Sequence, residues 1–373
     1  MDRDSFMDLA RRLAERGRYT VAPNPLVGAV VARNGAVVGE GWHERAGGDH
    51  AEVRALKAAG GAARGSTLYV TLEPCNHHGR TPPCTGALIR AGVERVVVGH
   101  LDPDPRMRGR SVRILRDSGI EVEVLDDLAF ERQNEQFAHY MRTGRPFVHL
   151  KLAATLDGRI ATSTGESAWI TGEAARRRAH ELRAEAGAVL VGAGTARSDD
   201  PLLTVRHIDA EPPLVTRVVL DPNLTLSPDS RLAKTAAEVP VLIFSAGDAA
   251  ADGRGKELER RGVEVLGAPV SEDGLHLGFV LGELARRGIR GVLVEGGGRT
   301  AAHFIAGGLV DKLTVFYAPK VLGGEGVPMI GALGLSRMEE ALRFSVSKVE
   351  TFGEDVAVTF YPAGEERVVY GTG

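Results

Sequence analysis

The stretch that decides the fold of the first half of this chain runs from residue 50 to residue 84. It opens with His50-Ala51-Glu52, continues to Glu73-Pro74-Cys75 and ends at Pro83-Cys84. The chain has only two cysteines, and both lie in this stretch. Two thiolates and one imidazole are three zinc ligands, which leave a fourth position for water, as in catalytic zinc sites. The pattern therefore predicts a catalytic zinc site.

The expected zinc ligands are His50, Cys75 and Cys84, and the expected catalytic proton shuttle is Glu52. His-x-Glu followed by Pro-Cys and a second cysteine is typical of zinc-dependent base deaminases, in which the glutamate moves protons. That signature places two residues between the cysteines, whereas eight separate them here. The alternative is that two core cysteines and a helix-capping histidine meet by chance. The polar composition of 76–83 argues against a core segment.

Bulk composition is that of a globular protein with two domains. The chain has 373 residues, of which 43% are hydrophobic and 25% are charged. A net charge of −3 gives no basic surface for nucleic acid. There is no apolar run of membrane-spanning length and no signal segment at the start, so we expect a cytoplasmic protein with cysteines used for metal or catalysis.

Hydrophobic periodicity predicts an α/β fold for the first domain, residues 1–145. Helices are expected at 2–17, from His50 to the glycines at 60–61 with Asp49 as cap, from Cys84 to about 92, and at 109–118 and 128–143. Strands are expected at 66–72, 93–99 and 120–125, and a hairpin is expected at Asn34-Gly35. Gly144-Arg145-Pro146 is the expected boundary of the second domain, residues 146–373.

Two glycine-containing loops are notable in the second domain. Gly192-Ala193-Gly194-Thr195 follows a strand, but it lacks a third glycine and no helix is expected after it, so a Rossmann fold is not assigned. Glu295-Gly296-Gly297-Gly298 joins a buried strand to a helix, where backbone N–H groups can approach a phosphate. The alternative is a tight turn, which needs about one glycine. Residues 312–321 and 342–361 are expected to form antiparallel edge strands.

The first half resembles the bifunctional deaminase–reductases of riboflavin biosynthesis. The matching stretches are 23–28, His50-Ala51-Glu52, the run from Leu72 through His77 to Cys84, and Asp102-Pro103-Asp104-Pro105. In that family the longer cysteine spacing is normal. The resemblance implies a cytidine-deaminase-like α/β/α domain that binds Zn²⁺. It also implies substrate contacts from Asn24, His43, His77 and Arg80, each of which alternatively is a surface hydrogen-bonding residue.

The second half is similar to the reductase domain of the same family, which has a dihydrofolate-reductase-like α/β fold and uses NADPH. The matching stretches are 151–159, 165–171, 199–206, 295–297 and 318–320. The implied cofactor contacts are Ala153, Trp169, Thr195, Asp199, Gly297, Gly298, Arg299, Thr300, Ala301, Ala302 and His303. The implied substrate contacts are Lys151, Ser167, Arg183, Leu203, Arg206 and Glu295. Thr155, where serine is common, and Pro222, where serine is usual, depart from the family pattern.

The resemblance implies two reactions. The first is hydrolytic deamination of 2,5-diamino-6-ribosylamino-pyrimidinone 5′-phosphate, and the second is NADPH-dependent reduction of the ribosyl group of 5-amino-6-(5-phosphoribosylamino)uracil to ribityl. The implied partners are these pyrimidine ribotides and further copies of the chain, with no nucleic acid and no membrane.

Three alternatives remain open at this point. One is a zinc-dependent deaminase of another nucleotide or base with a non-catalytic second domain, and another is a reductase with a structural zinc site. The third is a non-enzymatic scaffold, which leaves Glu52 beside an open zinc without a role. Release of ammonia and oxidation of NADPH distinguish them. A deaminase that acts on tRNA is disfavoured because the chain has no basic stripe.

Overall fold

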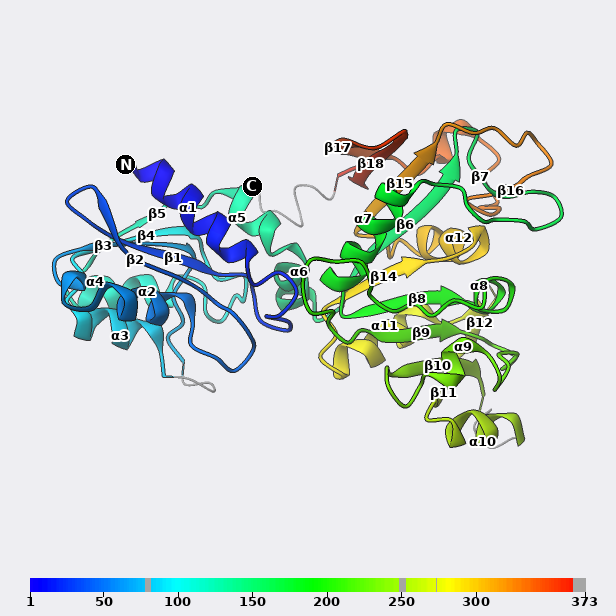
Figure 1. The fold of residues 1–373 in the computed structure, drawn as a ribbon, viewed down its shortest axis with the longest axis horizontal. Helices are drawn as coiled ribbons and strands as arrows, with labels where there is room; N and C mark the ends of the chain where they lie inside the picture. The colour runs from blue at the N-terminus through cyan, green and yellow to red at the C-terminus, as the bar shows by residue number, and fades with distance from the viewer. Residues whose placement is uncertain (78–81, 248–252, 273, 365–373) are drawn as a thin grey trace. The chain divides into compact units, whose positions relative to one another are not determined.

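The computed structural model describes residues 1–77, 82–247, 253–272 and 274–364, which form two compact units, Met1–Gly144 and Arg145–Gly373 (Figure 1). The division falls inside the Gly144-Arg145-Pro146 segment, one residue before the expected boundary. Among the described residues, no helix is long and apolar enough to cross a membrane.

The N-terminal unit is a five-stranded sheet with helices on both faces (Figure 1). The sheet order is β2-β1-β3-β4-β5, with β1 antiparallel to both neighbours and β3, β4 and β5 parallel. The strands are β1 (Gly28–Arg33), β2 (Ala36–Trp42), β3 (Thr67–Leu72), β4 (Arg95–His100) and β5 (Glu121–Val124). The parallel strands end at one edge of the sheet, so the segments after β3 and β4 lie side by side.

Two helical layers cover this sheet, which confirms the α/β/α architecture. Apolar side chains of α2 (Ala51–Ala59), α3 (Cys84–Ala91) and α4 (Arg110–Asp117) pack on one face. Those of α1 (Arg3–Glu15) and α5 (Leu128–Gln133) pack on the other, and α6 (Glu135–Thr143) ends the unit. A short 3-10 turn, Gly60–Ala63, follows α2.

Local sequence explains several of these elements. The hairpin between β1 and β2 turns at Asn34 and Gly35, whose φ angles of 51° and 76° are those of a type I′ turn. Helix α1 begins where the Asp2 carboxylate accepts the backbone N–H of Ser5 at 2.9 Å. The expected helix 128–143 is instead two helices, because the Asn134 side chain bonds both backbone groups of Leu26 and leaves the helical path.

The C-terminal unit is a nine-stranded sheet in the order β11-β10-β9-β8-β14-β6-β15-β18-β17 (Figure 1). The first seven strands in that order are parallel, and β18 and β17 continue the sheet antiparallel. Its strands are β6 (Phe147–Thr155), β8 (Ala188–Gly192), β9 (Thr216–Leu220), β10 (Val241–Ala246), β11 (Glu264–Ala268), β14 (Gly291–Glu295), β15 (Lys312–Ala318), β17 (Phe344–Phe352) and β18 (Asp355–Pro362).

Helices cover both faces of this sheet as well. Helices α11 (Leu277–Arg286) and α12 (Gly298–Ala306) pack on one face with Leu150 and Leu152 of β6, and α7 (Glu173–Glu185) packs on the opposite face near Ala153. Because side chains alternate along a strand, Lys151 lies on the α7 face. The remaining elements are α8 (Ala193–Ser198), α9 (Arg231–Lys234), α10 (Gly253–Arg260), a 3-10 turn (Met338–Glu340), and short strands β7 (Arg159–Ala161), β12 (Val270–Ser271), β13 (Gly274–Leu275) and β16 (Val327–Pro328).

Three further expectations about individual elements are wrong. His50, not Asp49, is the N-cap residue of α2. A helix, α8, does follow Gly192. Strand β15 is not an antiparallel edge strand, because α12 carries the chain back across the sheet and lets β15 pair parallel with β6.

Candidate functional sites

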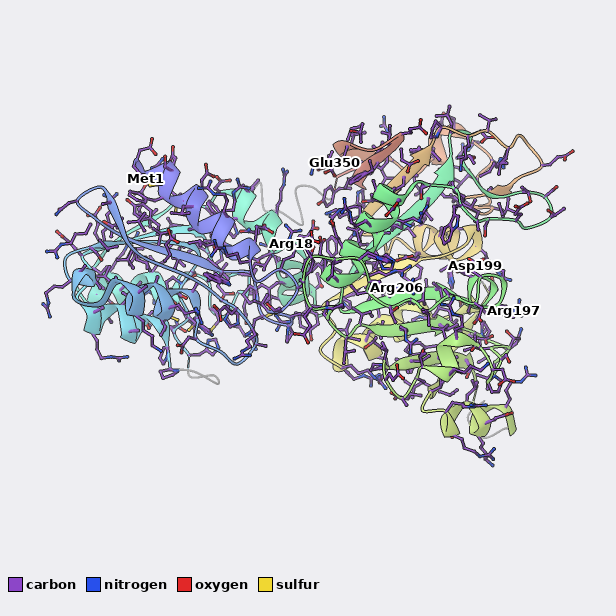
Figure 2. The ribbon with its side chains drawn as sticks, in the orientation of Figure 1. Met1, Arg18, Arg197, Asp199, Arg206 and Glu350 are labelled. Carbon is purple, nitrogen blue, oxygen red and sulfur yellow. The ribbon has the colours of Figure 1, made fainter. Side chains whose placement is uncertain are left out.

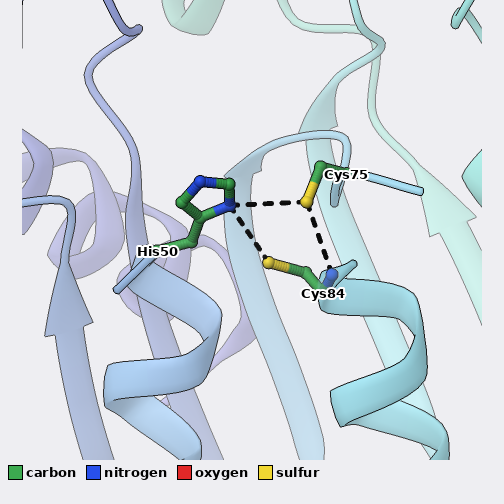
Figure 3. A group of neighbouring side chains, drawn as sticks. All are labelled: His50, Cys75 and Cys84. Carbon is green, nitrogen blue, oxygen red and sulfur yellow. Dashed lines mark hydrogen bonds between the residues drawn. The ribbon is translucent and has the colours of Figure 1, made fainter. Parts of the chain in front are cut away.

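The two cysteines and His50 form one cluster in the N-terminal unit (Figure 3). His50 Nδ1 lies 3.4 Å from Cys75 Sγ and 3.3 Å from Cys84 Sγ, and the three possible ligand atoms all lie within 4.8 Å of one another. His50 caps α2, Cys75 follows β3 and Cys84 begins α3. Three separate elements therefore converge on one point.

The spacing of these atoms fits a tetrahedral zinc ion. With Zn–N of about 2.0 Å and Zn–S of about 2.3 Å, tetrahedral angles separate a nitrogen and a sulfur ligand by about 3.5 Å. The two nitrogen–sulfur distances match that value. Three protein ligands leave one position for water or substrate, which is the arrangement of a catalytic rather than a structural zinc site.

The two thiols differ in acidity. A hydrogen bond from Cys84, opposed by burial and supported by His50, lowers the pKa of Cys75. The same hydrogen bond and burial raise the pKa of Cys84. Between the two neighbouring sulfurs, this hydrogen bond favours the thiolate at Cys75 and the thiol at Cys84. A cation that binds both sulfurs as thiolates removes this difference.

Glu52 lies in the first turn of α2 beside the cluster, and only 3% of it is exposed. Burial and the nearby Cys75 thiolate raise the pKa of Glu52 to about 7, against the opposing charge of His50. A carboxyl group with a pKa near neutrality can both accept and return a proton at that pH. The carboxyl group of Glu52 thus interacts with all three residues of the cluster.

His43 links Asn24 to the cluster. Its Nδ1 lies 3.2 Å from the carbonyl oxygen of Asp49 and its Nε2 lies 3.0 Å from Asn24 Nδ2. Burial lowers the pKa of His43, so the ring is neutral, donates from Nδ1 and accepts at Nε2. The rings of His43 and His50 meet edge to face with centroids 5.3 Å apart. Both ring nitrogens of His43 therefore have protein partners, and the Asn24 amide is held in place.

The other two residues predicted to contact the deaminase substrate have different outcomes. His77 is exposed and lies close enough to Asp102 for its charge to favour the carboxylate there. Burial nevertheless raises the pKa of Asp102 to about 6. Arg80 lies outside the described residues.

Sequence reasoning missed a residue that shapes this site. The buried Glu73 carboxylate accepts the backbone N–H groups of Asp102 at 3.1 Å, Gly109 at 2.8 Å and Ser111 at 2.9 Å. It thereby fixes both ends of the loop after β4 to the strand end that carries Cys75. The available signal was its position directly before Pro74-Cys75, inside the stretch that decides the fold.

A buried ion pair dominates the second candidate site. Arg183 of α7 and Glu295 at the end of β14 form a bidentate pair with distances of 2.6 and 2.9 Å, and each side chain is 14% exposed. Burial alone would raise the pKa of Glu295, but the Arg183 guanidinium and the Lys151 ammonium lower it to about 2. Burial lowers the pKa of Lys151, and the Glu295 carboxylate opposes that shift. Three predicted substrate residues are thus brought together.

Two of the remaining predicted substrate residues, Leu203 and Arg206, lie within two residues of Thr204, whose carbonyl oxygen accepts a hydrogen bond from Arg183. The backbone N–H of Arg206 donates to the ring of His180, and the Arg206 side chain is exposed (Figure 2). Burial and the neighbouring Arg183 lower the pKa of Arg206. Leu203 is buried with a φ of 51°, so only its backbone can face a ligand. Ser167 is half-buried on the loop before α7.

The glycine loop after β14 meets α8. The N–H of Gly297 donates to Thr195 Oγ1 at 3.1 Å, and no side chain caps α12. A Cβ on Gly298 would lie 2.4 Å from the carbonyl oxygen of Pro328, so that glycine is required by packing. The glycine run therefore serves close packing as well as leaving helix N–H groups open to an anion.

The expected cofactor residues of α12 fall on different faces of the helix. Arg299, Ala302 and His303 line a groove of about 730 Å³, together with Glu272 and His276. Thr300 instead lies beside Gly192 and Gly296, towards Thr195. Ala301 is fully buried. The structure thus gathers Thr195, Gly297 and Thr300, but not Arg299, Ala302 and His303, in one place.

Two further expected cofactor residues are solvent-exposed. Asp199 ends α8 and is exposed (Figure 2), and Trp169 is 70% exposed. Ala153 lies half-buried on β6, directly opposite Phe316 of β15. All three lie on segments at the carboxyl ends of parallel strands or on loops that contact those ends, which is where ligands bind in open α/β sheets.

Known proteins match both halves of the chain. Residues 1–100 match the cytidine and deoxycytidylate deaminase zinc-binding region, and residues 146–358 match the RibD C-terminal domain. The riboflavin biosynthesis protein RibD of Aquifex aeolicus is 45% identical over 95% of this chain and 97% of its own. The RibD of Escherichia coli is 40% identical over 96% of this chain and 99% of its own.

Solved structures agree over the same length. Acinetobacter baumannii RibD has a TM-score of 0.87, with 37% identity over 96% of this chain and 98% of that one. A Thermotoga maritima diaminohydroxyphosphoribosylaminopyrimidine deaminase/5-amino-6-(5-phosphoribosylamino)uracil reductase has a TM-score of 0.84, with 37% identity and the same coverage. With a zinc-type cluster in one unit and a matching reductase sheet in the other, the chain belongs to the RibD family, the bifunctional deaminase–reductases of riboflavin biosynthesis.

Proposed function

We propose that the N-terminal unit deaminates 2,5-diamino-6-ribosylamino-pyrimidinone 5′-phosphate. We also propose that the C-terminal unit then reduces the ribosyl group of 5-amino-6-(5-phosphoribosylamino)uracil with NADPH. One observation carries the first step: three ligand atoms at zinc spacing lie beside the buried carboxyl group of Glu52. The Thermotoga relative, whose printed name contains both activities, supports the choice of substrates.

His50, Cys75 and Cys84 would hold the zinc ion, and Glu52 would carry the proton. Zinc bound at such a site supplies Lewis-acid activation of water at neutral pH. Glu52 accepts a proton from the attacking water and returns it to the amino group. A C–O bond forms as the C–N bond breaks, so one water is consumed and one ammonia is released.

Asn24 and His77 are proposed to orient the pyrimidine ribotide. Because both ring nitrogens of His43 have protein partners, we assign His43 to holding the Asn24 amide rather than to bonding the substrate directly. The loop held by Glu73 brings Asp102 to the same strand-end crevice. Arg80 is proposed to meet the substrate phosphate, as the family resemblance implies.

In the C-terminal unit, the order of strands suggests how NADPH would lie. Thr195 follows β8, Gly297 follows β14, and Lys151 is on the next strand, β6. A pyrophosphate at the start of α12 would therefore place one ring of the cofactor on the β6 side. NADPH would supply the hydride, and these residues would bind and orient it for the sugar and exclude water. Reduction consumes one hydride and one proton and opens the ribosyl ring to a ribityl chain.

Lys151, Arg183 and Glu295 are proposed to fix the substrate at that position. Arg183 and Glu295 are locked by their bidentate pair, so their remaining hydrogen-bonding positions are preorganised. Arg206 adds an exposed cation for the substrate phosphate. Ser167 and the backbone of Leu203 complete this set of substrate contacts.

The test supplies the diaminopyrimidinone ribotide with and without NADPH. The protein should release one ammonia per substrate in both cases, and should oxidise one NADPH only when it is present. No NADPH oxidation on the deaminated substrate would support a non-catalytic second domain.

In Cys75→Ser, bound zinc should fall from about one per chain towards none, while NADPH oxidation on the deaminated substrate persists. An unchanged zinc content contradicts the assigned ligands.

We further propose that the protein is a cytoplasmic homo-oligomer. Strand β17 is the last strand of its sheet, and Val346 and Val349 on it are each 60% exposed. An edge strand that carries exposed valines and pairs with no further described strand on its outer side is suited to pairing with a second copy. Light scattering should give a mass above that of one 39.6 kDa chain, and Val349→Lys should lower it. A monomeric wild-type protein contradicts the proposal.

A further inference from the structure

The loop before α7 holds an exposed aromatic ring on a firmly fixed backbone. Lys320 Nζ donates to the carbonyl oxygen of Trp169, Arg176 donates to that of Thr171, and the N–H of Gly172 donates to Asp355, each at 2.7 Å. These anchors come from the segment after β15, from α7 and from β18. Despite them, Trp169 is 70% exposed. Three hydrogen bonds thus fix the backbone of this loop, while the indole ring itself stays open to solvent.

Arg176 fixes the ring as well as the loop. Its guanidinium carbon lies 4.7 Å from the centre of the Trp169 ring, while its Nη1 is bonded to Thr171. The stacked guanidinium covers one face of the indole and limits its rotation. The other tryptophan, Trp42, has two arginines over its ring, Arg16 and Arg54, and is only half-exposed. Trp169, with one such partner, keeps surface for a further planar group.

The position of Trp169 indicates which planar group. Lys320, which binds the carbonyl oxygen of Trp169, follows β15. In the sheet, β6 lies between β15 and β14, the strand that leads into the glycine loop. Thr195, at the other side of that loop, follows β8. A dinucleotide whose pyrophosphate lies at Gly297 would therefore direct one ring past β6 towards Trp169 and the other past β8. Lys151, on β6, marks the Trp169 side as the side of the reacting substrate.

We infer that Arg176 is a positioning residue that holds the Trp169 indole so that its open face stacks on the nicotinamide ring of NADPH. The inference rests on the proposed reductase function, and it assigns a role to a residue that touches neither ligand. Because the indole is ordered in advance, NADPH does not bear the entropy cost of ordering it. Loss of Arg176 should weaken NADPH binding and leave the hydride step largely intact.

The test uses a Trp42→Phe background, in which Trp169 is the sole tryptophan. NADPH should quench its emission, and Arg176→Ala should raise both the quenching midpoint and the KM for NADPH about 3–10-fold. The kcat should stay within about twofold. Arg176→Lys keeps the charge without the planar stacking group. Its quenching midpoint and its KM should lie between those of the background protein and those of Arg176→Ala. Arg177→Ala, at an exposed neighbour on the same helix, should match the background protein.

Each outcome separates this inference from the proposed function. No oxidation of NADPH on the deaminated substrate overturns the proposed function itself. Oxidation without quenching of Trp169 leaves the function standing and overturns the inference. Quenching whose midpoint and KM are the same in Arg176→Ala as in the background also overturns it. A fall in thermal stability with an unchanged KM shows a merely structural arginine and has the same consequence.

Discussion

The zinc cluster and the reductase site are assembled in different ways. The three zinc-type ligands come from a stretch of 35 residues, 50–84, and His50 Nδ1 lies 3.3–3.4 Å from each of the two sulfurs. Lys151, Arg183 and Glu295 come from β6, α7 and β14, and much of the rest of that site is exposed side chain, as at Trp169 and Arg206. The first group of residues is compact and drawn from neighbouring segments, whereas the second is spread over three elements of a large sheet.

The difference follows from what each chemistry demands of the chain. A metal ion fixes the mutual distances of its ligands to within a few tenths of an ångström, so a small, recognisable set of residues is needed. Hydride transfer is the chemistry of the cofactor, so the protein contributes binding and orientation, which many residues share. Mutations should therefore act sharply at the first site and gradually at the second.

The largest effect is expected at Glu52. Glu52→Gln removes the proton-transfer group and should lower the deamination rate by about 10²–10⁴-fold. Bound zinc and NADPH oxidation on the deaminated substrate should be unchanged, as measured by metal analysis and by absorbance. Glu40→Gln, an exposed glutamate on β2, is the matched control. A parallel loss of both activities contradicts two separate sites.

Breaking the Arg183–Glu295 pair should destabilise the C-terminal unit. Glu295→Gln keeps the shape but leaves the guanidinium buried without its carboxylate, which costs about 3–5 kcal/mol. Urea unfolding followed by Trp169 emission in the Trp42→Phe background measures the change. Glu173→Gln, exposed in the first turn of α7, should shift stability by less than about 0.5 kcal/mol. Equal urea midpoints for Glu295→Gln and Glu173→Gln would mean that the Arg183–Glu295 pair adds nothing to the free energy of unfolding.

Acid should weaken the same unit in two windows. Burial lowers the pKa of His180 to about 4, so between pH 6.5 and 4 the unfolded chain takes up a proton that the folded one does not. The depressed pKa of Glu295 gives stability that is present above pH 4.5 and is lost as the pH falls towards 2. Thermal midpoints measured from pH 7 to 3 should fall throughout, and less steeply below pH 4.5 in Glu295→Gln. If the thermal midpoints of the wild-type and Glu295→Gln proteins fell equally steeply below pH 4.5, the assignment of that window to Glu295 would be contradicted.

A smaller effect is expected at Glu73, and it should show whether this residue holds the loop beside the zinc site or takes part in metal binding. Glu73→Gln replaces an acceptor of three N–H groups by an amide with one oxygen, which should cost about 1.5–3 kcal/mol. The loop from Asp102 should shift, so the KM for the deaminase substrate should rise while bound zinc stays near one per chain. Glu94→Gln, exposed before β4, is the control. Loss of zinc in Glu73→Gln would place the residue in metal binding instead.

Sequence alone predicted the parts of the molecule that local rules govern. The Asn34-Gly35 hairpin, the helix at Cys84, and the convergence of His50, Cys75 and Cys84 all follow from turn chemistry, periodicity or ligand type. Each of these features depends on residues within a short stretch of chain. For the same reason the zinc cluster was the most specific prediction of chemistry.

Features set by distant contacts were not predictable in the same way. The helix break at Asn134 depends on hydrogen bonds to Leu26, more than a hundred residues away in sequence. The position of β15 inside the sheet depends on β6, and the need for Gly298 depends on Pro328. The low pKa of Glu295 requires Arg183 on another element. None of these partners is visible in the residues that surround each position.

The cap position of His50 has a consequence for supply of the metal. His50 and Cys84 stand where loop becomes helix at α2 and α3, so an ion held there fastens the folded N-terminal unit together, and its binding energy adds to folding. No comparable histidine–cysteine–carboxylate group lies in the described part of the C-terminal unit. Zinc starvation should therefore slow the first reaction and spare the second. The ratio of the two activities of this one polypeptide should then depend on the zinc supply of the cell.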